Sequence, residues 1–140
     1  YAIQKQTDSR KIQRPTLMTI DENDLDLQLR QFTGTIKYYR ITPHTVLTDG
    51  AKFLADNADA YWLMTTIASY LTDFIDREDF IVAKLTVDKT TDHAVFKLDN
   101  GNGLVLAEQI IEYTDFALSA IKLYACWTAK FWVVMLPSEY

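Results

Sequence analysis

Apolar residues between positions 48 and 75 recur three or four places apart. The set comprises Ala60, Leu63, Met64, Ile67, Leu71, Phe74 and Ile75. This spacing places their side chains on one face of a helix. Thr48-Asp49-Gly50 supplies capping and turn residues at the start. Because Asn57 interrupts the pattern, we expect a short helix over residues 52–56 and a longer one over residues 59–75.

After Phe80 the apolar positions alternate with polar ones, which is the period of a strand with one buried face. The tract Asp99-Asn100-Gly101-Asn102-Gly103 contains residues that tolerate positive φ, so it predicts a hairpin. The last segment is apolar on both faces, as in a central strand. We expect strands over residues 81–88, 94–98, 104–113, 121–127 and 131–136.

The first part of the chain is less regular. Residues 1–24 are polar and mixed in charge, which predicts a tail or an arm. Helical spacing of apolar residues then predicts a short helix over residues 24–32, with Asp24 as its cap. Residues 35–41 are rich in Thr, Ile and Tyr and predict a strand, and residues 45–48 form a brief extended piece.

These elements predict a single α+β domain over residues 25–140, in which an antiparallel sheet of about five to six strands carries its helices on one face. The chain has 140 residues, of which 49% are hydrophobic, enough for one buried core. No apolar run approaches the roughly 18 residues of a membrane-spanning helix, so we expect no membrane location. Cys126 is the single cysteine, which favours a reducing cytoplasm.

The charge argues against a nucleic-acid partner. The net charge is −5, with 19 acidic against 14 basic residues, whereas affinity for DNA or RNA comes largely from Lys and Arg on phosphates. The tract Lys37-Tyr38-Tyr39-Arg40 contains rings that could stack on bases. A strand with alternating exposure explains the same tract better.

The residues that could bind a metal or act as a nucleophile do not form a pattern. His44 and His93 lie in expected loops, and neither has the partner spacing of a zinc site. Cys126 lies in an apolar strand, where thiols are mostly inert. An acidic cluster ends the long helix but lacks the spacing of a calcium loop; it contains Asp73, Asp76, Glu78 and Asp79. We therefore expect no metal and no cofactor.

Four polar residues remain as candidates for a cleft between helix and sheet: His44, Asp49, Glu112 and Asp115. Two carboxyl groups beside an aromatic cleft could perform acid–base chemistry if they converge. The simpler interpretation makes Asp49 a helix cap, Asp115 a turn residue and Glu112 a solvent-facing side chain.

Aromatic residues make up 13% of the chain. Tyr and Trp concentrate at protein interfaces because their rings tolerate a half-wet setting. Tyr61 and Trp62 are adjacent on the expected helix, so they cannot both face one core. The candidate interaction surface consists of Tyr38, Tyr39, Tyr61, Trp62, Trp127 and Trp132.

Several phrases of the sequence resemble a bacterial domain family of unknown function. They are Leu29-Arg30-Gln31-Phe32-Thr33-Gly34-Thr35, Tyr38-Tyr39-Arg40, Thr48-Asp49-Gly50, Ala60-Tyr61-Trp62-Leu63, Glu112-Tyr113-Thr114-Asp115-Phe116 and Leu136-Pro137-Ser138-Glu139-Tyr140. The resemblance covers roughly residues 27–140, and the chain departs from the family pattern at Ala117, where Pro is usual. It implies a compact bacterial cytoplasmic protein and brings no catalytic residues.

Two hypotheses of different classes follow. The first is a non-catalytic interaction module that forms a homo-oligomer or holds a protein partner. It uses its arm and an aromatic surface. The second is a small enzyme or small-molecule-binding protein with a cleft between helix and sheet, which requires at least two of the four polar candidates to meet.

Overall fold

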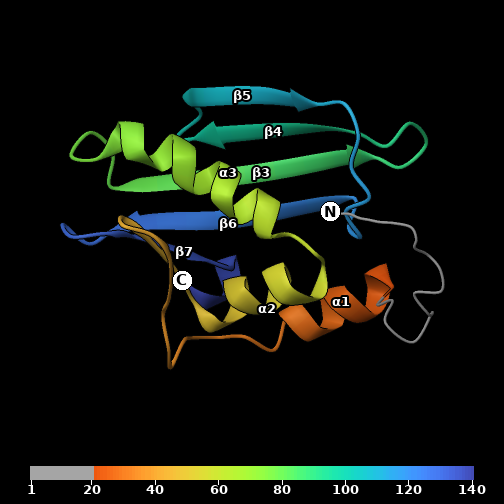
Figure 1. Cartoon of the computed structure of the whole chain (residues 1–140), viewed down its shortest axis with the longest axis horizontal. Helices are drawn as coiled ribbons and strands as arrows, with labels where there is room; N and C mark the ends of the chain where they lie inside the picture. Colours follow the sequence, from red (N-terminus) through yellow and green to blue (C-terminus); the bar gives the residue numbers. More distant parts are fainter. Residues whose placement is uncertain (1–20) are drawn as a thin grey trace.

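The computed structural model describes residues 21–140, in which one sheet carries all the helices on one face (Figure 1). Most of the expected arm, residues 1–20, lies outside the described residues. The helices are α1 (Glu22–Leu29), α2 (Asp49–Asn57) and α3 (Tyr61–Leu71), with 3-10 turns η2 (Thr72–Phe74) and η3 (Pro137–Glu139). The strands are β1 (Tyr39–Thr42), β2 (Thr45–Leu47), β3 (Phe80–Asp88), β4 (His93–Asp99), β5 (Val105–Ile111), β6 (Ala120–Trp127) and β7 (Trp132–Met135).

Within residues 21–140 the sheet has seven strands, in the order β1-β2-β7-β6-β3-β4-β5. The expected α+β class is confirmed, but the expected count of five to six strands is too low. The sheet is also mixed, because β2 and β7 are parallel while every other pair is antiparallel. The additional strand, β2, has three residues, too few for an alternation of apolar and polar positions to identify it.

The helix boundaries differ from the expected ones because of their caps. α2 begins at Asp49, three residues before the expected start, since the Thr48 hydroxyl accepts the Ala51 N–H at 3.2 Å. α1 begins at Glu22, because Asp21 rather than Asp24 is the cap. Asp59 has a φ of 51°, a left-handed conformation that separates α2 from α3.

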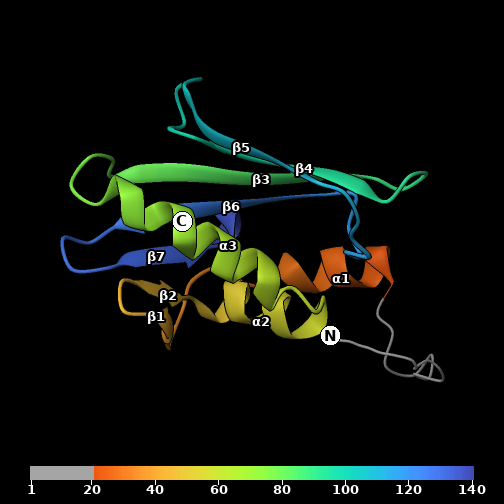
Figure 2. The same cartoon turned by 45° about the horizontal axis from the view of Figure 1, so that its top comes forward.

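The core lies between the sheet and the helix layer, as Figure 2 shows with the helices below strands β3, β4 and β6. The alternation in β3 places Ile81, Ala83 and Leu85 on the helix-facing side, where all three are buried. α3 buries the helical face predicted from the sequence, including Leu63, Met64 and Ile67. The opposite side of the sheet carries the alternate positions, and the helices leave it uncovered.

Within residues 21–140, none of the helices combines the length and the apolar character that a membrane crossing requires.

Candidate functional site

Three of the sequence phrases meet at the N-terminal end of α2. The carboxylate of Glu139 accepts hydrogen bonds from the Thr48 hydroxyl at 2.6 Å, from Gly50 N–H at 3.0 Å and from Leu136 N–H at 2.9 Å. Asp49 in turn donates its N–H to the Thr35 hydroxyl at 2.8 Å. A Cβ at position 50 would lie 2.5 Å from the Glu139 carboxylate, so any larger residue there displaces this side chain.

The polar groups at the N-terminal end of α2 are used in hydrogen bonds that hold the fold together. The Asp49 carboxylate accepts the Ile36 N–H at 2.8 Å, and this bond lowers the pKa of Asp49 below its usual value. An acid with a lowered pKa that caps backbone N–H groups is a poor proton donor. The sequence interpretation of Asp49 as the helix cap is therefore wrong: Thr48 caps α2, and the Asp49 carboxylate instead binds the segment before β1.

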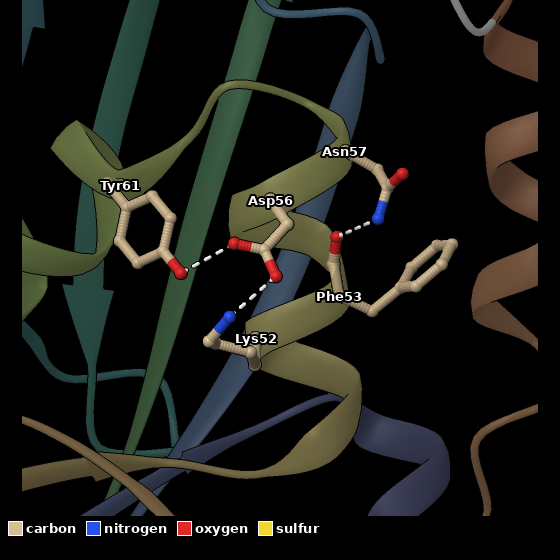
Figure 3. A network of polar contacts seen from close by, with 5 residues as sticks. All are labelled: Lys52, Phe53, Asp56, Asn57 and Tyr61. Carbon is tan, nitrogen blue, oxygen red and sulfur yellow. Dashed lines mark hydrogen bonds and ion pairs between the residues drawn. The ribbon is translucent and has the colours of Figure 1, made fainter.

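A second polar group lies on the exposed side of α2 and α3 (Figure 3). Asp56 accepts hydrogen bonds from the Lys52 ammonium and from the Tyr61 hydroxyl, both at 2.6 Å. The bond from Lys52 is the main cause that lowers the pKa of Asp56, and the same bond raises the pKa of Lys52. Burial raises the pKa of the Tyr61 hydroxyl.

Lys52 also faces two of the candidate interface rings, with its ammonium 5.2 Å from the Tyr39 ring centre and 5.9 Å from that of Tyr61. Such cation–π contacts stabilise an exposed site by about 0.5–1 kcal/mol. Lys52 thus links Tyr39 of β1 to α2 and α3. The polar group formed by Lys52, Asp56 and Tyr61 therefore has a structural role.

Two further phrases meet where α3 approaches the loop after β5. Trp62 packs edge-on against Phe116, with ring centres 6.5 Å apart. A hollow of about 190 Å³ lies beside them, lined by Trp62, Ile111, Tyr113, Thr114 and Asp115. This volume is below the 300–1,000 Å³ typical of ligand pockets.

The four polar cleft candidates occupy separate places. His44 lies in the turn between β1 and β2, and Asp49 lies at the start of α2. Asp115 lines the hollow beside Trp62, and Glu112 is exposed at the end of β5. Within the described residues, no hydrogen bond joins two of the four, the hollow beside Trp62 contains only Asp115 of the four, and no group of three potential metal ligands occurs.

The six aromatic candidates do not form one surface. Trp132 is fully buried and donates its indole N–H to Leu71 O at 3.0 Å, so it belongs to the core. Trp127 is half-buried against it, with ring centres 5.3 Å apart. Tyr39 and Tyr61 face Lys52, and only Tyr38 and Tyr61 are exposed. Adjacent aromatics in a sequence do not show which of them face solvent.

Among residues 21–140, four exposed apolar side chains lie along the edge strand β5 and its flanking residues, which the sequence interpretation did not single out. The exposed fractions are 57% for Leu104, 48% for Val105, 63% for Ile110 and 69% for Tyr113. Residues 104–111 contain one ionisable side chain, Glu108, and no proline. The alternation predicted a strand here, but only the strand order places it at the edge of the sheet.

The backbone direction of β5 follows from the hydrogen-bond register. Val87 donates its N–H to Ser119 O at 2.8 Å, so the odd residues of β3 face β6 and the even ones face β4. The even residues of β3 pair with odd residues of β4, and the even residues of β4 pair with odd residues of β5. The odd residues of β5 therefore bind β4, and the N–H and C=O groups of Glu108 and Ile110 point outward. Within residues 21–140 no strand pairs with the outer side of β5, so this side can accept another strand.

The family model described as "Family of unknown function (DUF6876)" matches residues 23–140, and the chain therefore belongs to this family. No match was found among the curated proteins. The solved structures likewise gave no match.

Proposed function

We propose that this member of the DUF6876 family is a non-catalytic protein-interaction module of the bacterial cytoplasm, and that two copies pair through strand β5. The observation that carries the proposal is the exposure of Leu104, Val105, Ile110 and Tyr113 along one open edge. Natural proteins usually blunt such an edge with charges, proline or a covering loop.

The opposite edge of the sheet provides a contrast. β1 has four residues, and its pairing with β2 is irregular between Arg40 and Thr42. β5 has seven residues and pairs with β4 along its length, with one irregularity next to Asp99. A longer strand offers more backbone groups to a partner, so β5 is the better docking edge.

A second copy fits β5 because an antiparallel pair of identical strands is self-complementary around a two-fold axis. The single charge of the strand, Glu108, lies opposite Lys97 on β4. This neighbour reduces the repulsion between the Glu108 carboxylates of two copies. The apolar side chains then supply the area that is removed from water on pairing.

The test compares the same substitution at two exposed isoleucines. Ile110→Lys introduces a charge on the open edge, whereas Ile36→Lys changes a side chain that is 92% exposed and lies outside the sheet. We expect wild type and Ile36→Lys to have about twice the 16.1 kDa mass of the chain in light scattering at 100 µM, and Ile110→Lys to have the monomer mass. A monomeric wild type, or a dimeric Ile110→Lys variant, would contradict the proposal.

A further inference from the structure

The sheet contains a second open stretch of backbone, in its interior. β7 ends its pairing with β6 at Tyr124 and Met135, whereas β6 extends back to Ala120 while paired with β3. Figure 2 shows β6 continuing above α1 past the end of β7. Residues 120–123 of β6 therefore have a strand on one side only.

The free groups of this stretch can be assigned from the register. Trp127 donates its N–H to Asp79 O on the β3 side, and Thr128 donates its N–H to Phe131 O on the β7 side, both at 2.9 Å. By alternation, the N–H and C=O groups of Lys122 and Ala120 point to the side where β7 would continue. Within residues 21–140, these groups have no hydrogen-bond partner on that side.

The sequence itself ends the β7 ladder at this point. Continuing the register of Tyr124 with Met135 would place Pro137 opposite Lys122. Proline has no N–H to donate, and Pro137 instead begins the turn η3 that carries Glu139 to α2. Residues 120–123 of β6 are therefore left unpaired on this side because the chain after Met135 turns away to bring Glu139 to the start of α2.

A groove of about 440 Å³ lies along this stretch, within the size range of ligand sites. Its lining consists of Asp26, Leu29, Arg30, Ala120, Ile121, Lys122, Leu136, Pro137 and Ser138. The buried side chains of Leu29 and Leu136 provide an apolar wall on the helix side. α1 is held in place as this wall by Glu22, whose carboxylate accepts the Ser119 N–H at 3.1 Å and the Ser119 hydroxyl at 3.0 Å.

The charges around the groove favour an acidic occupant. The lining contains two basic residues, Arg30 and Lys122, and one acid, Asp26, which pairs with Arg30 at 2.7 Å. Lys122 also lies directly opposite Lys84 on β3. The Asp99 carboxylate lies 3.6 Å from the Lys84 ammonium and offsets part of its charge, and a carboxylate of the occupant beside Lys122 would reduce the remaining repulsion between the two lysines.

We infer that this groove binds an extended acidic peptide strand, antiparallel to β6 and in line with β7. Peptide N–H and C=O groups would pair with Lys122 and Ala120, as in the addition of a strand to a sheet edge. A residue opposite Lys122 points to the uncovered face and is acidic, whereas its neighbour points toward Leu29 and Leu136 and is apolar. Residues 120–123 accommodate about four peptide residues, a length of about 13 Å.

The experiment titrates the full ¹⁵N-labelled chain with the peptide acetyl-Leu-Glu-Leu-Glu-Leu-amide and follows backbone amide shifts by NMR. We expect the amides of Ala120 and Lys122 to shift most. The same peptide with both Glu nitrogens methylated lacks the N–H donors, so we expect its Kd to rise at least about tenfold. The Lys-for-Glu version of the peptide tests the charge, and we expect no saturable shifts with it.

A matched pair of protein variants locates the site. Lys122→Glu removes the cation that lines the groove, and Lys97→Glu makes the same change two strands away on the same face of the sheet. We expect Kd to rise about fivefold or more for the first and to stay within about twofold for the second. A lack of binding at millimolar peptide, equal binding of the methylated peptide, or equal loss in both variants would overturn the inference. Both comparisons are repeated in the Ile110→Lys background, which leaves the lining of the groove unchanged, so that the outcome does not depend on pairing through β5 or on the position of Lys97 opposite Glu108.

Discussion

Replacement of Gly50 by alanine tests whether the Glu139 carboxylate stabilises the start of α2. A Cβ at position 50 would lie 2.5 Å from Glu139 Oε1 and 2.7 Å from Leu136 Cδ1. Both atoms end flexible side chains and can move, so the cost lies in the hydrogen bonds that Glu139 loses. Those bonds come from Thr48 Oγ1 and from Gly50 N–H.

The expected change in the free energy of unfolding follows from these contacts. Hydrogen bonds to a charged group contribute about 1.5–3 kcal/mol each, and we take the low end for both because Glu139 is partly exposed. Alanine regains at most about 1 kcal/mol through its higher helix propensity. Gly50→Ala should therefore lower the free energy of unfolding by about 2 kcal/mol. For a chain of 140 residues this corresponds to a Tm lower by about 7 °C.

The assay is thermal and urea denaturation followed by circular dichroism, carried out as a double-mutant cycle. In a Glu139→Ala background the carboxylate is absent, so Gly50→Ala should change the unfolding free energy by between zero and about +1 kcal/mol. Gly34→Ala is the control, because a Cβ there meets no atom within 4 Å. Equal destabilisation by Gly50→Ala in both backgrounds would refute the reasoning.

Three further outcomes are expected. Trp132→Phe removes a buried indole whose N–H binds Leu71 O, so urea denaturation should show a loss of about 2–4 kcal/mol; a change below 0.5 kcal/mol would contradict the assigned contact. The pKa of Asp49 is lowered by the Ile36 N–H, so the stability that its carboxylate adds is present above the unfolded value of 3.8 and lost as pH falls through the lower folded pKa. The difference in urea midpoint between wild type and Asp49→Asn should thus narrow from pH 7 to pH 3, and a constant difference would count against this bond. Burial raises the pKa of Cys126, so the folded chain should react with Ellman's reagent at pH 8 more slowly than the chain in urea; equal rates would disagree with that burial.

The part of the fold that sequence reasoning recovered is the part with long, regular patterns. The apolar face of residues 60–71 predicted α3, and the alternation from Ile81 onward predicted β3. The tract 99–103 forms the expected turn, with φ of 83° at Gly101 and 94° at Gly103. These features depend on neighbours in the sequence, which a reader of one chain can see.

The features that were missed depend on residues far apart in the chain. The earlier start of α2 has a local cause in the Thr48 cap, but the bond from Gly50 N–H to Glu139, 89 positions later, leaves no local pattern in the sequence. The parallel pairing of β2 with β7 likewise joins Val46 to Val133. The burial of Trp132 has the same cause, because an apolar tract indicates that Trp132 lies in a strand but not which elements cover it. The open edge at β5 follows from strand order, which no local pattern encodes.

The position of β7 in the sheet has a consequence for how the protein is made. β7 is the strand farthest along the chain, yet it separates the pair β1–β2 from the four strands β3 to β6. A ribosome that has released everything before Trp132 holds two half-sheets with no common strand, each exposing backbone that β7 will later cover. Completion of the sheet therefore waits for β7, and an mRNA truncated before the Trp132 codon yields a polypeptide prone to aggregate.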